Sequence, residues 1–567
     1  MFLIALSFIY IIFTCINFGL VYSRFIKFHP SDLILNSLLG LFSITIITSI
    51  WALFGRIHIE FHLFILFLNC FIFYFYQKEI KANYIEFSKE FKNINRFLKS
   101  FLFFSMLLIL AQAASIPYVL DNESYYIQTI KWLNNYGFVE GLANLHLFLG
   151  QQSGWHITQS AFSFSFLYNE FNDLSAFCLL LGITYSVFRL QDYLTTKDSN
   201  QLIFGLLPLF LVLLFQFISA PSPDLPIYIL TFFLFYVFLE HYNKMTIGVF
   251  NLLTTFVLFM LYIKNTNIGL IILPLLLFLK HSKDFVPQLF RISSIAFLVL
   301  ALFLLKNIII TGTPVFPLTA RLFYSFEHVI PEKIVYAYYM ELKTSYGFYV
   351  TAEEYKSMNA YQLFVQWLSM PKLNGLFNKI SIILLVVCPF LILRMKRLRN
   401  YGILYLIMVI HLMILLVTSP QYRFHLNFVL FFSLFCLAIA FHEKIKIIYF
   451  GLIASGLVTL LVLIVPLDFN AFSSNKFLLK NSTFNIENII IPHPKTKLMT
   501  EHETYTLGNL TYHSPIKNEF FWASGDGPLP CVNKVQLDYY EYWLHLIPQM
   551  QTADLKDGFY AKDISKP

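Results

Sequence analysis

Long apolar stretches, separated by short polar connections, run through most of this chain. A helix needs roughly 20 predominantly apolar residues to cross the hydrocarbon layer of a membrane. By that criterion the pattern predicts about fourteen membrane spans. They lie near residues 1–22, 33–54, 59–77, 98–118, 173–188, 201–219, 226–241, 247–263, 266–280, 292–309, 378–393, 402–418, 425–441 and 446–465. The first has no basic start and no small-residue cleavage site, so we interpret it as a retained span and not as a signal peptide.

The composition excludes a soluble protein. Hydrophobic residues make up 57% of the 567 positions, charged residues only 13%, and phenylalanine alone accounts for 65. A soluble domain of this size could not bury that much apolar surface, so the bilayer must act as its solvent. The expected fold is an all-α polytopic membrane protein.

The apolar pattern ends near Asp468 and divides the chain. We expect N-terminal spans with a basic loop over residues 1–97 and a membrane core over residues 98–467. Residues 468–567 are more polar but hold aromatic clusters such as EFFWAS and DYYEYWLHLIP. That part is too apolar for a disordered tail. It predicts a small α/β-like or irregular domain, or a cap lying on the membrane core.

The distribution of basic residues predicts the orientation. Segments 76–100, 394–400 and 442–446 are rich in Lys and Arg and fall on one side if the spans alternate. That side holds about 20 loop Lys and Arg, and the other about 9, so the first should be cytoplasmic. The net charge of +8 follows from this bias and does not indicate a nucleic-acid partner.

The predicted outer side carries the irregular, chemically varied segments. They are residues 119–172, 218–225, 306–376 and 418–424, together with the C-terminal part. Most of the connections on the basic side are short and charged. Binding and catalytic residues concentrate on such irregular segments, so we expect any chemistry on the outer side.

Two carboxylates, Asp121 and Glu123, follow a predicted span directly, and an amphipathic helix is predicted from Tyr126 onward. One interpretation is structural: Asp caps helix N-termini well, and Glu near a helix start complements the helix dipole. The other is a functional acid at the membrane edge. Residues two apart do not share a helical face, so both could act together only if Asp121 is non-helical, as a cap is.

A third acid and two cations lie at similar positions. Asp224 follows Pro221 and Pro223 in a short turn, which is either only a rigid turn or a means of holding the acid near the membrane surface. Lys306 and Arg423 fall at outer ends of spans. They either extend their charges toward the membrane interface or bind a phosphate together. The planar guanidinium of Arg can donate two parallel hydrogen bonds to a phosphate.

His146 and His156 lie ten residues apart in the first outer segment. That spacing is not the i, i+4 pair of a helical metal site. Each histidine either satisfies a local hydrogen bond in the loop or contacts substrate, and we retain both as candidate substrate-binding residues.

Several of these stretches together resemble GT-C-type membrane glycosyltransferases. They are an acid in the first large outer loop, the element NIIITGTPVFP (Asn307 to Pro317) and the Arg423-Phe424 pair at the start of a late span. More narrowly, YIQTIKWLNNYGFVEGLANLHLFLGQQSGWH (Tyr126 to His156) and APSPDLP (Ala220 to Pro226) look like a poorly characterised multi-spanning family of Bacteroidota and other bacteria. Three predicted spans precede the hairpin that carries the acidic loop, whereas in GT-C enzymes that loop follows the first span.

The resemblance implies a function. GT-C enzymes typically take a sugar from a polyprenyl-phosphate or polyprenyl-diphosphate carrier, use a loop acid as base, sometimes with a divalent metal such as Mg or Mn, and hold the lipid phosphate with basic residues. Carried over, Asp121 is the catalytic acid and candidate metal ligand, with Glu123 and Asp224 supporting it and Arg423 contacting the phosphate. The implied acceptor is a glycan, a lipid or a protein at the periplasmic face of a bacterial inner membrane.

Two other classes stay open. A polysaccharide polymerase or ligase would share lipid-linked substrates but depend on basic residues and on the large outer segment 306–376. A transporter or an envelope scaffold is the third class. Ion-coupled transporters usually carry ionisable residues in mid-membrane, and the predicted spans are nearly free of them, with Lys264 near an end.

Overall fold

The computed structural model describes residues 1–28, 32–318, 326–395, 398–516 and 518–565. Lys396 and Arg397, part of the basic stretch 394–400, lie outside them. Within the described residues, eleven helices are long and apolar enough to cross a membrane. They are α1 (Phe2–Phe25), α2 (Leu33–Ala52), α3 (Ile59–Asn93), α4 (Arg96–Ala113), α8 (Leu174–Thr196), α11 (Asp224–His241), α15 (Phe290–Thr311), α19 (Lys372–Ile392), α20 (Leu398–Val417), α21 (Tyr422–Ala440) and α22 (Ile445–Ile464). The predicted helical fold is thereby confirmed, and its long apolar helices are those expected of a membrane protein.

Three of the predicted spans fall on shorter apolar helices. These cover Ser199–Phe215, Ile247–Ile263 (α12) and Asn265–Lys280. The first is divided into α9 (Ser199–Gly205), η3 (Leu207–Phe210) and α10 (Leu211–Phe215), with Pro208 near the start of η3. Proline lacks an N–H and cannot continue the helical hydrogen bonding, which explains the interruption. The number of membrane crossings therefore stays a prediction.

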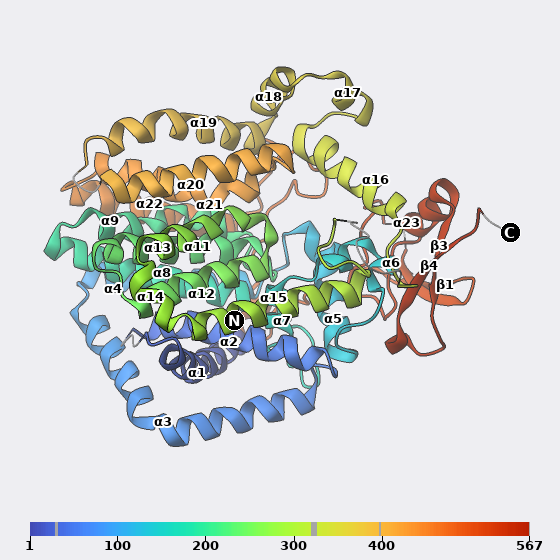
Figure 1. Cartoon of the computed structure of the whole chain (residues 1–567), viewed down its shortest axis with the longest axis horizontal. Helices are drawn as coiled ribbons and strands as arrows, with labels where there is room; N and C mark the ends of the chain where they lie inside the picture. The colour runs from blue at the N-terminus through green and yellow to red at the C-terminus, as the bar shows by residue number, and fades with distance from the viewer. Residues whose placement is uncertain (29–31, 319–325, 396–397, 517, 566–567) are drawn as a thin grey trace.

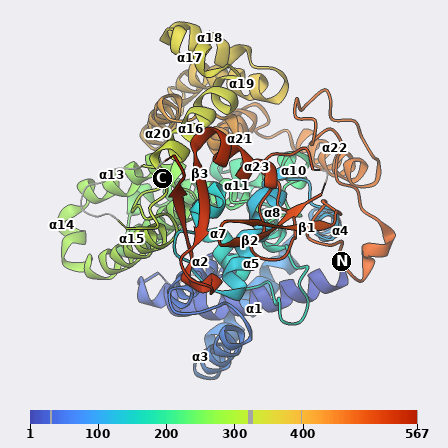
Figure 2. The same ribbon diagram turned by 90° about the vertical axis from the view of Figure 1, so that its right-hand side faces the viewer.

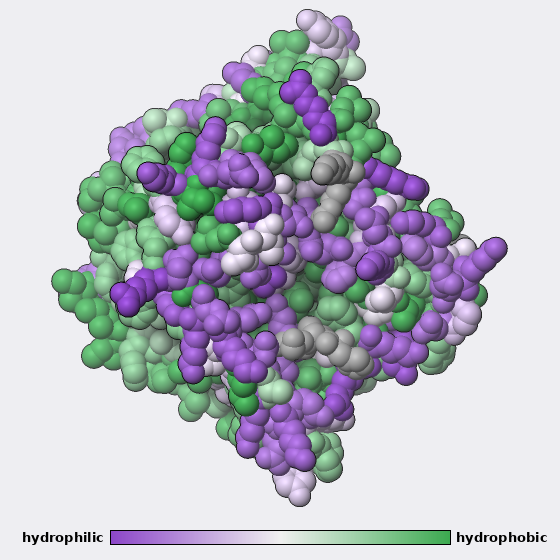
Figure 3. Space-filling model, turned by 90° about the vertical axis from the view of Figure 1, so that its left-hand side faces the viewer, coloured by the Kyte–Doolittle hydropathy of each residue, from purple (hydrophilic) through white to green (hydrophobic). Residues whose placement is uncertain are grey.

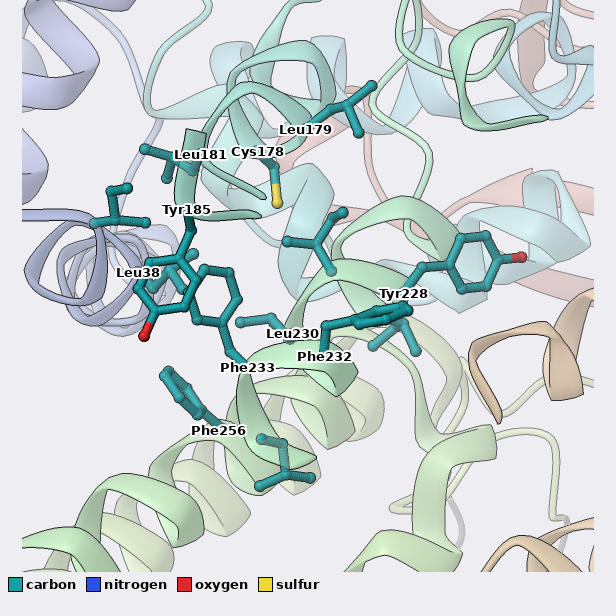
Figure 4. Packing of buried hydrophobic residues seen from close by; sticks show 14 of the residues in the cluster. Leu38, Cys178, Leu179, Leu181, Tyr185, Tyr228, Leu230, Phe232, Phe233 and Phe256 are labelled. Atoms are coloured by element: carbon teal, nitrogen blue, oxygen red, sulfur yellow. The ribbon is translucent and has the colours of Figure 1, made fainter. Parts of the chain in front are cut away.

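Aromatic packing forms the core of the bundle. In Figure 4 side chains of α8 and α11 interlock with neighbours on α2 and α12. The rings of Tyr185 and Phe233 lie 4.6 Å apart. Elsewhere α1 and α2 approach so closely that a Cβ on Gly19 would lie 1.8 Å from the carbonyl oxygen of Asn36. Small residues allow such close helix contacts in membranes. Close packing stabilises the contact there, because moving an apolar side chain from lipid to a protein interface gives no hydrophobic free energy.

The basic segment after the third span is helical. A charged connector is predicted over residues 76–100, but α3 continues through Asn93 and bends at Tyr76, which has non-helical dihedral angles. Figure 1 shows α3 running along the outside of the bundle. Asn17 of α1 donates a hydrogen bond of 3.0 Å to Asn69 of α3, which ties the exposed helix to its neighbour.

The C-terminal region, residues 468–565, packs on one end of the bundle, which we call the capped end (Figures 1 and 2). It contains two separate antiparallel hairpins and a short helix. Their bounds are β1 (His502–Leu507), β2 (Leu510–Pro515), α23 (Lys534–Tyr539), β3 (Leu546–Met550) and β4 (Phe559–Asp563). The short helices at the same end are η1 (Asn122–Tyr126), α5 (Ile127–Asn135), α6 (Leu142–Leu145), η2 (Leu147–Gln151), α7 (Gly154–Ser160), α16 (Glu332–Lys343), η7 (Thr344–Phe348), α17 (Ala352–Ser357) and α18 (Ala360–Ser369).

The C-terminal region shares its hydrophobic core with the segment that follows α4. The rings of Trp132 and Phe559 lie 5.7 Å apart. Gly141 has φ +60°, and a Cβ there would lie 1.9 Å from the carbonyl oxygen of Phe559. Only glycine accepts both that conformation and that approach. The region is thus a cap built onto the membrane core.

The opposite end of the bundle is polar. Figure 3 views the molecule from that side and shows hydrophilic residues gathered over the middle of the face, with hydrophobic residues toward the margins. The pattern is that expected for helix ends and connections surrounded by lipid-facing sides.

Candidate functional site

Four charged side chains from separate parts of the sequence meet at the capped end. Asp121 Oδ2 lies 3.0 Å from Arg423 Nη1, and Lys264 Nζ bonds Asp224 Oδ1. Both carboxylates are close enough to Arg423 to stabilise its positive charge. We call these four residues the Asp–Arg cluster. The structure thus brings together three of the residues singled out in the sequence and adds Lys264.

Helix termini place these side chains at one level. Asp121 precedes η1, and Asp224 is the first residue of α11, where a carboxylate complements the helix dipole. Arg423 is the second residue of α21. Lys264 lies in extended conformation directly after α12. Because all four helix ends face the capped end, residues up to 302 positions apart become neighbours.

Neighbouring groups orient the guanidinium. Arg423 Nε donates to Gln421 Oε1 at 3.0 Å, which leaves its outer edge for Asp121. The ring of Phe424 lies 5.1 Å from Arg423 Cζ and 4.2 Å from Lys264 Nζ. The Tyr126 hydroxyl donates to Asp121 Oδ2 at 3.4 Å. The side chains of Asp121 and Arg423 stay 29% and 37% exposed, so a ligand can reach both.

Comparison with known families gives one result. Residues 1–430, about three quarters of the chain, match a family model described as "Domain of unknown function (DUF8201)". The chain belongs to the DUF8201 family. No curated protein and no solved structure matches it.

All four residues of the Asp–Arg cluster lie within the part that matches the DUF8201 family. The match ends at residue 430, seven positions after Arg423, so the C-terminal region falls outside it. The cluster therefore lies in the part of the membrane core that defines the family, whereas the cap lies outside the matched residues.

The structure places Glu123 away from the cluster. Its side chain is 3% exposed and accepts hydrogen bonds from the hydroxyl of Thr496, from the backbone N–H of Lys497 at 2.9 Å and from Asn122 Nδ2 at 3.0 Å. Its carbonyl oxygen accepts from Ser524 and Gly525. Glu123 therefore anchors the C-terminal region, and the geometry gives it no catalytic position beside Asp121.

His146 is also a structural group. It is 1% exposed, its Nδ1 accepts from the backbone N–H of Phe148 at 3.2 Å, and its Nε2 lies 3.2 Å from the carbonyl oxygen of Trp522. The local hydrogen-bonding interpretation from the sequence describes it well, and it does not reach the Asp–Arg cluster.

His156 and Lys306 form a buried polar group behind the cluster. Lys306 is 3% exposed and donates to the carbonyl oxygen of Gln152. His156 is fully buried, and its ring lies 4.5 Å from that of Tyr126, which itself bonds Asp121. Neither side chain is accessible to a ligand at the cluster, and His156 packs against the tyrosine that donates to Asp121.

Both buried histidines should make folding sensitive to acid. Burial lowers the pKa of His146 to about 4, and burial, aided by the charge of Lys306, lowers the pKa of His156 to about 3. In the unfolded chain each takes up a proton near pH 6.5. The folded state does not, so the free energy of unfolding should fall as the pH drops from about 6.5 toward 4, by about 3 kcal/mol per histidine.

The matched variant is His156→Phe, which keeps the ring volume between the tyrosines but cannot take up a proton. Thermal unfolding of the detergent-solubilised protein from pH 7.5 to 4 should show a shallower loss of stability for this variant than for the wild type. Equal slopes would contradict the assignment of His156 as a buried neutral group.

The cluster holds no preformed set of three protein metal ligands. Among the described residues, no three His, Cys, Asp or Glu side chains converge as ligands. Asp121 and Asp224 each already face a cation, Arg423 and Lys264. Mg is usually held by one or two carboxylates together with substrate phosphates. The divalent metal that the family resemblance implies at Asp121 therefore stays a prediction.

Sequence reasoning missed the groups that complete the site. In the sequence, Lys264 stands out only as a charge near the end of a span. Because a cation at such a position usually has a charged partner, this was a signal that the residue belongs to a site. Tyr338 of α16 contacts Gln151, and burial raises its pKa, with Arg423 and Asp121 close by. No periodic signal marks these residues, because only packing brings α16 over the capped end.

Proposed function

We propose that this protein is an integral membrane glycosyltransferase of the bacterial inner membrane. It transfers a sugar from a polyprenyl-phosphate-type carrier to a glycan, lipid or protein acceptor at the periplasmic face. The observation that carries the proposal is the accessible Asp121–Arg423 pair beside Asp224 and Lys264, at an end of an apolar helix bundle. A lipid-linked donor explains why such groups stand where the helices end.

The orientation follows from charge. The end opposite the cap holds the basic part of α3 beyond Tyr76, the described end of α19 and start of α20, and the basic connection 442–446 between α21 and α22. Positively charged connections favour the cytoplasm. We therefore infer that the capped end, with its Asp–Arg cluster, faces the periplasm, where lipid-linked sugars and not nucleotide sugars serve as donors.

The cluster supplies the groups that glycosyl transfer needs. The acceptor oxygen forms a bond to the anomeric carbon as the bond from that carbon to the carrier phosphate breaks. Asp121 takes the proton from the acceptor hydroxyl, which contributes typically about 10²- to 10⁴-fold. The released phosphate carries the negative charge, and Arg423 and Lys264 stabilise it as it develops. In the resting state Arg423 holds Asp121; a phosphate that engages Arg423 leaves the carboxylate free to act.

A polysaccharide polymerase or ligase is the second candidate. The observation that favours it is the long segment 306–376, which reaches the cluster: Trp367 of α18 donates to the carbonyl oxygen of Pro420 at 2.8 Å, three residues before Arg423. In that mechanism the cations carry the reaction and the loss of Arg423 outweighs the loss of Asp121.

Replacement of the Arg423 guanidinium tests the proposal in a deletion strain. In the strain without the wild-type gene, we expect one envelope glycan to disappear and its lipid-linked sugar to accumulate, both measured by mass spectrometry. Arg423→Gln should restore the glycan roughly 10²- to 10³-fold less efficiently than the wild type, and Arg423→Lys should be intermediate because it keeps the charge without the planar guanidinium.

Arg56→Gln is the matched control. Arg56 pairs with Glu60 at 2.6 Å on an exposed surface and makes no hydrogen bond or ion pair with the four described residues of the cluster, so the Arg56→Gln variant should restore the glycan fully. Unchanged glycans and unchanged lipid-linked sugars in the deletion strain would contradict the proposed transfer.

A further inference from the structure

A polar cavity of about 340 Å³ lies on the side of α5 that faces away from the cap core. Its walls come from α5, from residues 163–172, from His58 at the start of α3, and from Lys495 with Pro528 and Leu529 of the C-terminal region. Cavities that bind small molecules measure about 300 to 1,000 Å³. The volume suits one small ligand.

The two lysines in the wall are already saturated. Lys131 Nζ donates to the carbonyl oxygens of Asp526 and Gly527 at 2.9 and 3.0 Å and lies 2.6 Å from Asp526 Oδ1. Lys495 Nζ donates to the carbonyl oxygen of Asn169 at 2.6 Å and to its Oδ1 at 2.8 Å, and it lies 3.6 Å from Asp526 Oδ1. An ammonium group has three protons to donate. Neither lysine therefore offers a free set of donors to an anion, which argues against a phosphate site.

The remaining polar lining consists of amides, hydroxyls and His58. Asn134 Nδ2 donates to Ser163 at 2.9 Å, and Asn134 Oδ1 and the Ser165 hydroxyl are covered by protein atoms. Asn135 and Asn169 are exposed and line the cavity, so their amides open onto it. A ligand that carries hydrogen-bonding groups can pair with these amides.

The other features of the wall narrow the ligand class. None of the described residues that line the cavity is a carboxylate, so nothing there attracts a cation. Tyr136 and Phe171 add ring surfaces beside the amides and hydroxyls. Neutral hydrogen-bonding groups combined with aromatic faces match a molecule that carries hydroxyls around an apolar ring of C–H groups.

We propose that this cavity binds a neutral sugar unit, as a site separate from the Asp–Arg cluster. The η1 turn and α5 lie between the two, and Asn172 in the cavity wall donates to Asn122, the residue after Asp121, at 3.1 Å. The assignment stands on the cavity alone and does not require that the protein transfers sugars.

Binding by the full-length protein in phospholipid nanodiscs, free of glycoside detergent, tests the site. Saturation-transfer difference NMR is recorded with methyl glycosides of glucose, galactose, mannose and N-acetylglucosamine and with maltotriose. We expect at least one of them to bind with a Kd of about 1 mM and inorganic phosphate not to compete. If only the octyl glycoside of the same sugar, held in the nanodisc bilayer, gives a signal, the ligand is a glycolipid head group and not a soluble glycan.

Ser165→Leu fills the cavity without removing a hydrogen bond within the described protein, so folding should be retained; an unchanged melting temperature checks this. It should weaken sugar binding at least about tenfold. The control is Ser357→Leu, at an exposed serine of α17 outside the cavity, which should leave binding unchanged. Absence of binding by every sugar, competition by phosphate, or equal binding by the Ser165→Leu variant would each overturn the proposal.

Discussion

Replacement of Asp121 by asparagine is expected to lower sugar transfer by roughly 10²- to 10⁴-fold, because the amide cannot accept the proton of the acceptor hydroxyl. The fold should persist. Asp121 is 29% exposed, and the amide oxygen of asparagine can still accept hydrogen bonds from Arg423 and Tyr126. The measurement is restoration of the missing glycan in the deletion strain, together with the melting temperature of the purified variant.

The matched control for this experiment is Asp192→Asn. Asp192 Oδ2 lies 3.0 Å from Arg189 Nη1, the same separation as in the Asp121–Arg423 pair, and its side chain is also partly exposed. It stands near the end of α8, away from the capped end. Full activity of Asp192→Asn with loss in Asp121→Asn would separate catalysis from the general effect of breaking an ion pair. Full activity of Asp121→Asn would remove Asp121 as the base.

Comparison with Arg423→Gln then separates the two enzymatic mechanisms. A transferase that uses a carboxylate base loses most activity with Asp121→Asn. A polymerase or ligase that depends on cations loses most with Arg423→Gln and keeps most with Asp121→Asn. Both variants alter the same 3.0 Å contact, so differences in folding contribute little to the comparison.

Replacement of Glu123 by alanine is expected to release the C-terminal region from the membrane core. It leaves two donors of the C-terminal region without their acceptor, the Thr496 hydroxyl and the Lys497 N–H, whereas Asn122 Nδ2 keeps the carbonyl oxygen of Lys495 at 2.8 Å. Leaving a buried hydrogen-bond donor unsatisfied costs about 1–3 kcal/mol. Hydrogen exchange read by mass spectrometry should show faster exchange over residues 495–500 and 524–532, and limited proteolysis should cut within the region.

Glu140→Ala is the control for that change. Glu140 lies in the same outer segment, but its side chain is 53% exposed, and among the described residues that side chain receives only one long, exposed hydrogen bond from the C-terminal region, from Gln551 Nε2 at 3.5 Å. It should leave exchange in the C-terminal region unchanged. If Glu123→Ala also leaves it unchanged, the shared hydrophobic core around Trp132 and Phe559 is sufficient to dock the region, and the anchoring role assigned to Glu123 is wrong.

The two acids thus illustrate how neighbouring residues acquire different roles. Asp121 precedes the π-helical turn η1 and faces Arg423, whereas Glu123 lies inside the turn and faces the C-terminal region. A π-helical turn is a feature often found at functional sites. Here it directs one carboxylate to an accessible cluster and the other to a buried interface.

The sequence by itself determined the features that depend on neighbouring residues only. The position of each apolar helix follows from some twenty consecutive residues, and the concentration of charge at helix ends follows from the cost of charges within the bilayer. For that reason Asp121, Asp224 and Arg423 could be selected without a structure. The hairpins of the C-terminal region and the helical continuation of α3 beyond Tyr76 were not predicted, since their local signals are weak.

The tertiary structure alone decided which charges meet. Lys264 joins Asp224 and Arg423 stands against Asp121 because α11, α12 and α21 end at one level, a relation that depends on how the helices pack and not on any residue spacing. Burial of Glu123, His146 and Lys306 likewise depends on segments far away in the chain covering them. A sequence pattern indicates whether a residue is more stable in water or in lipid. Which charges become partners is decided by how distant segments pack together.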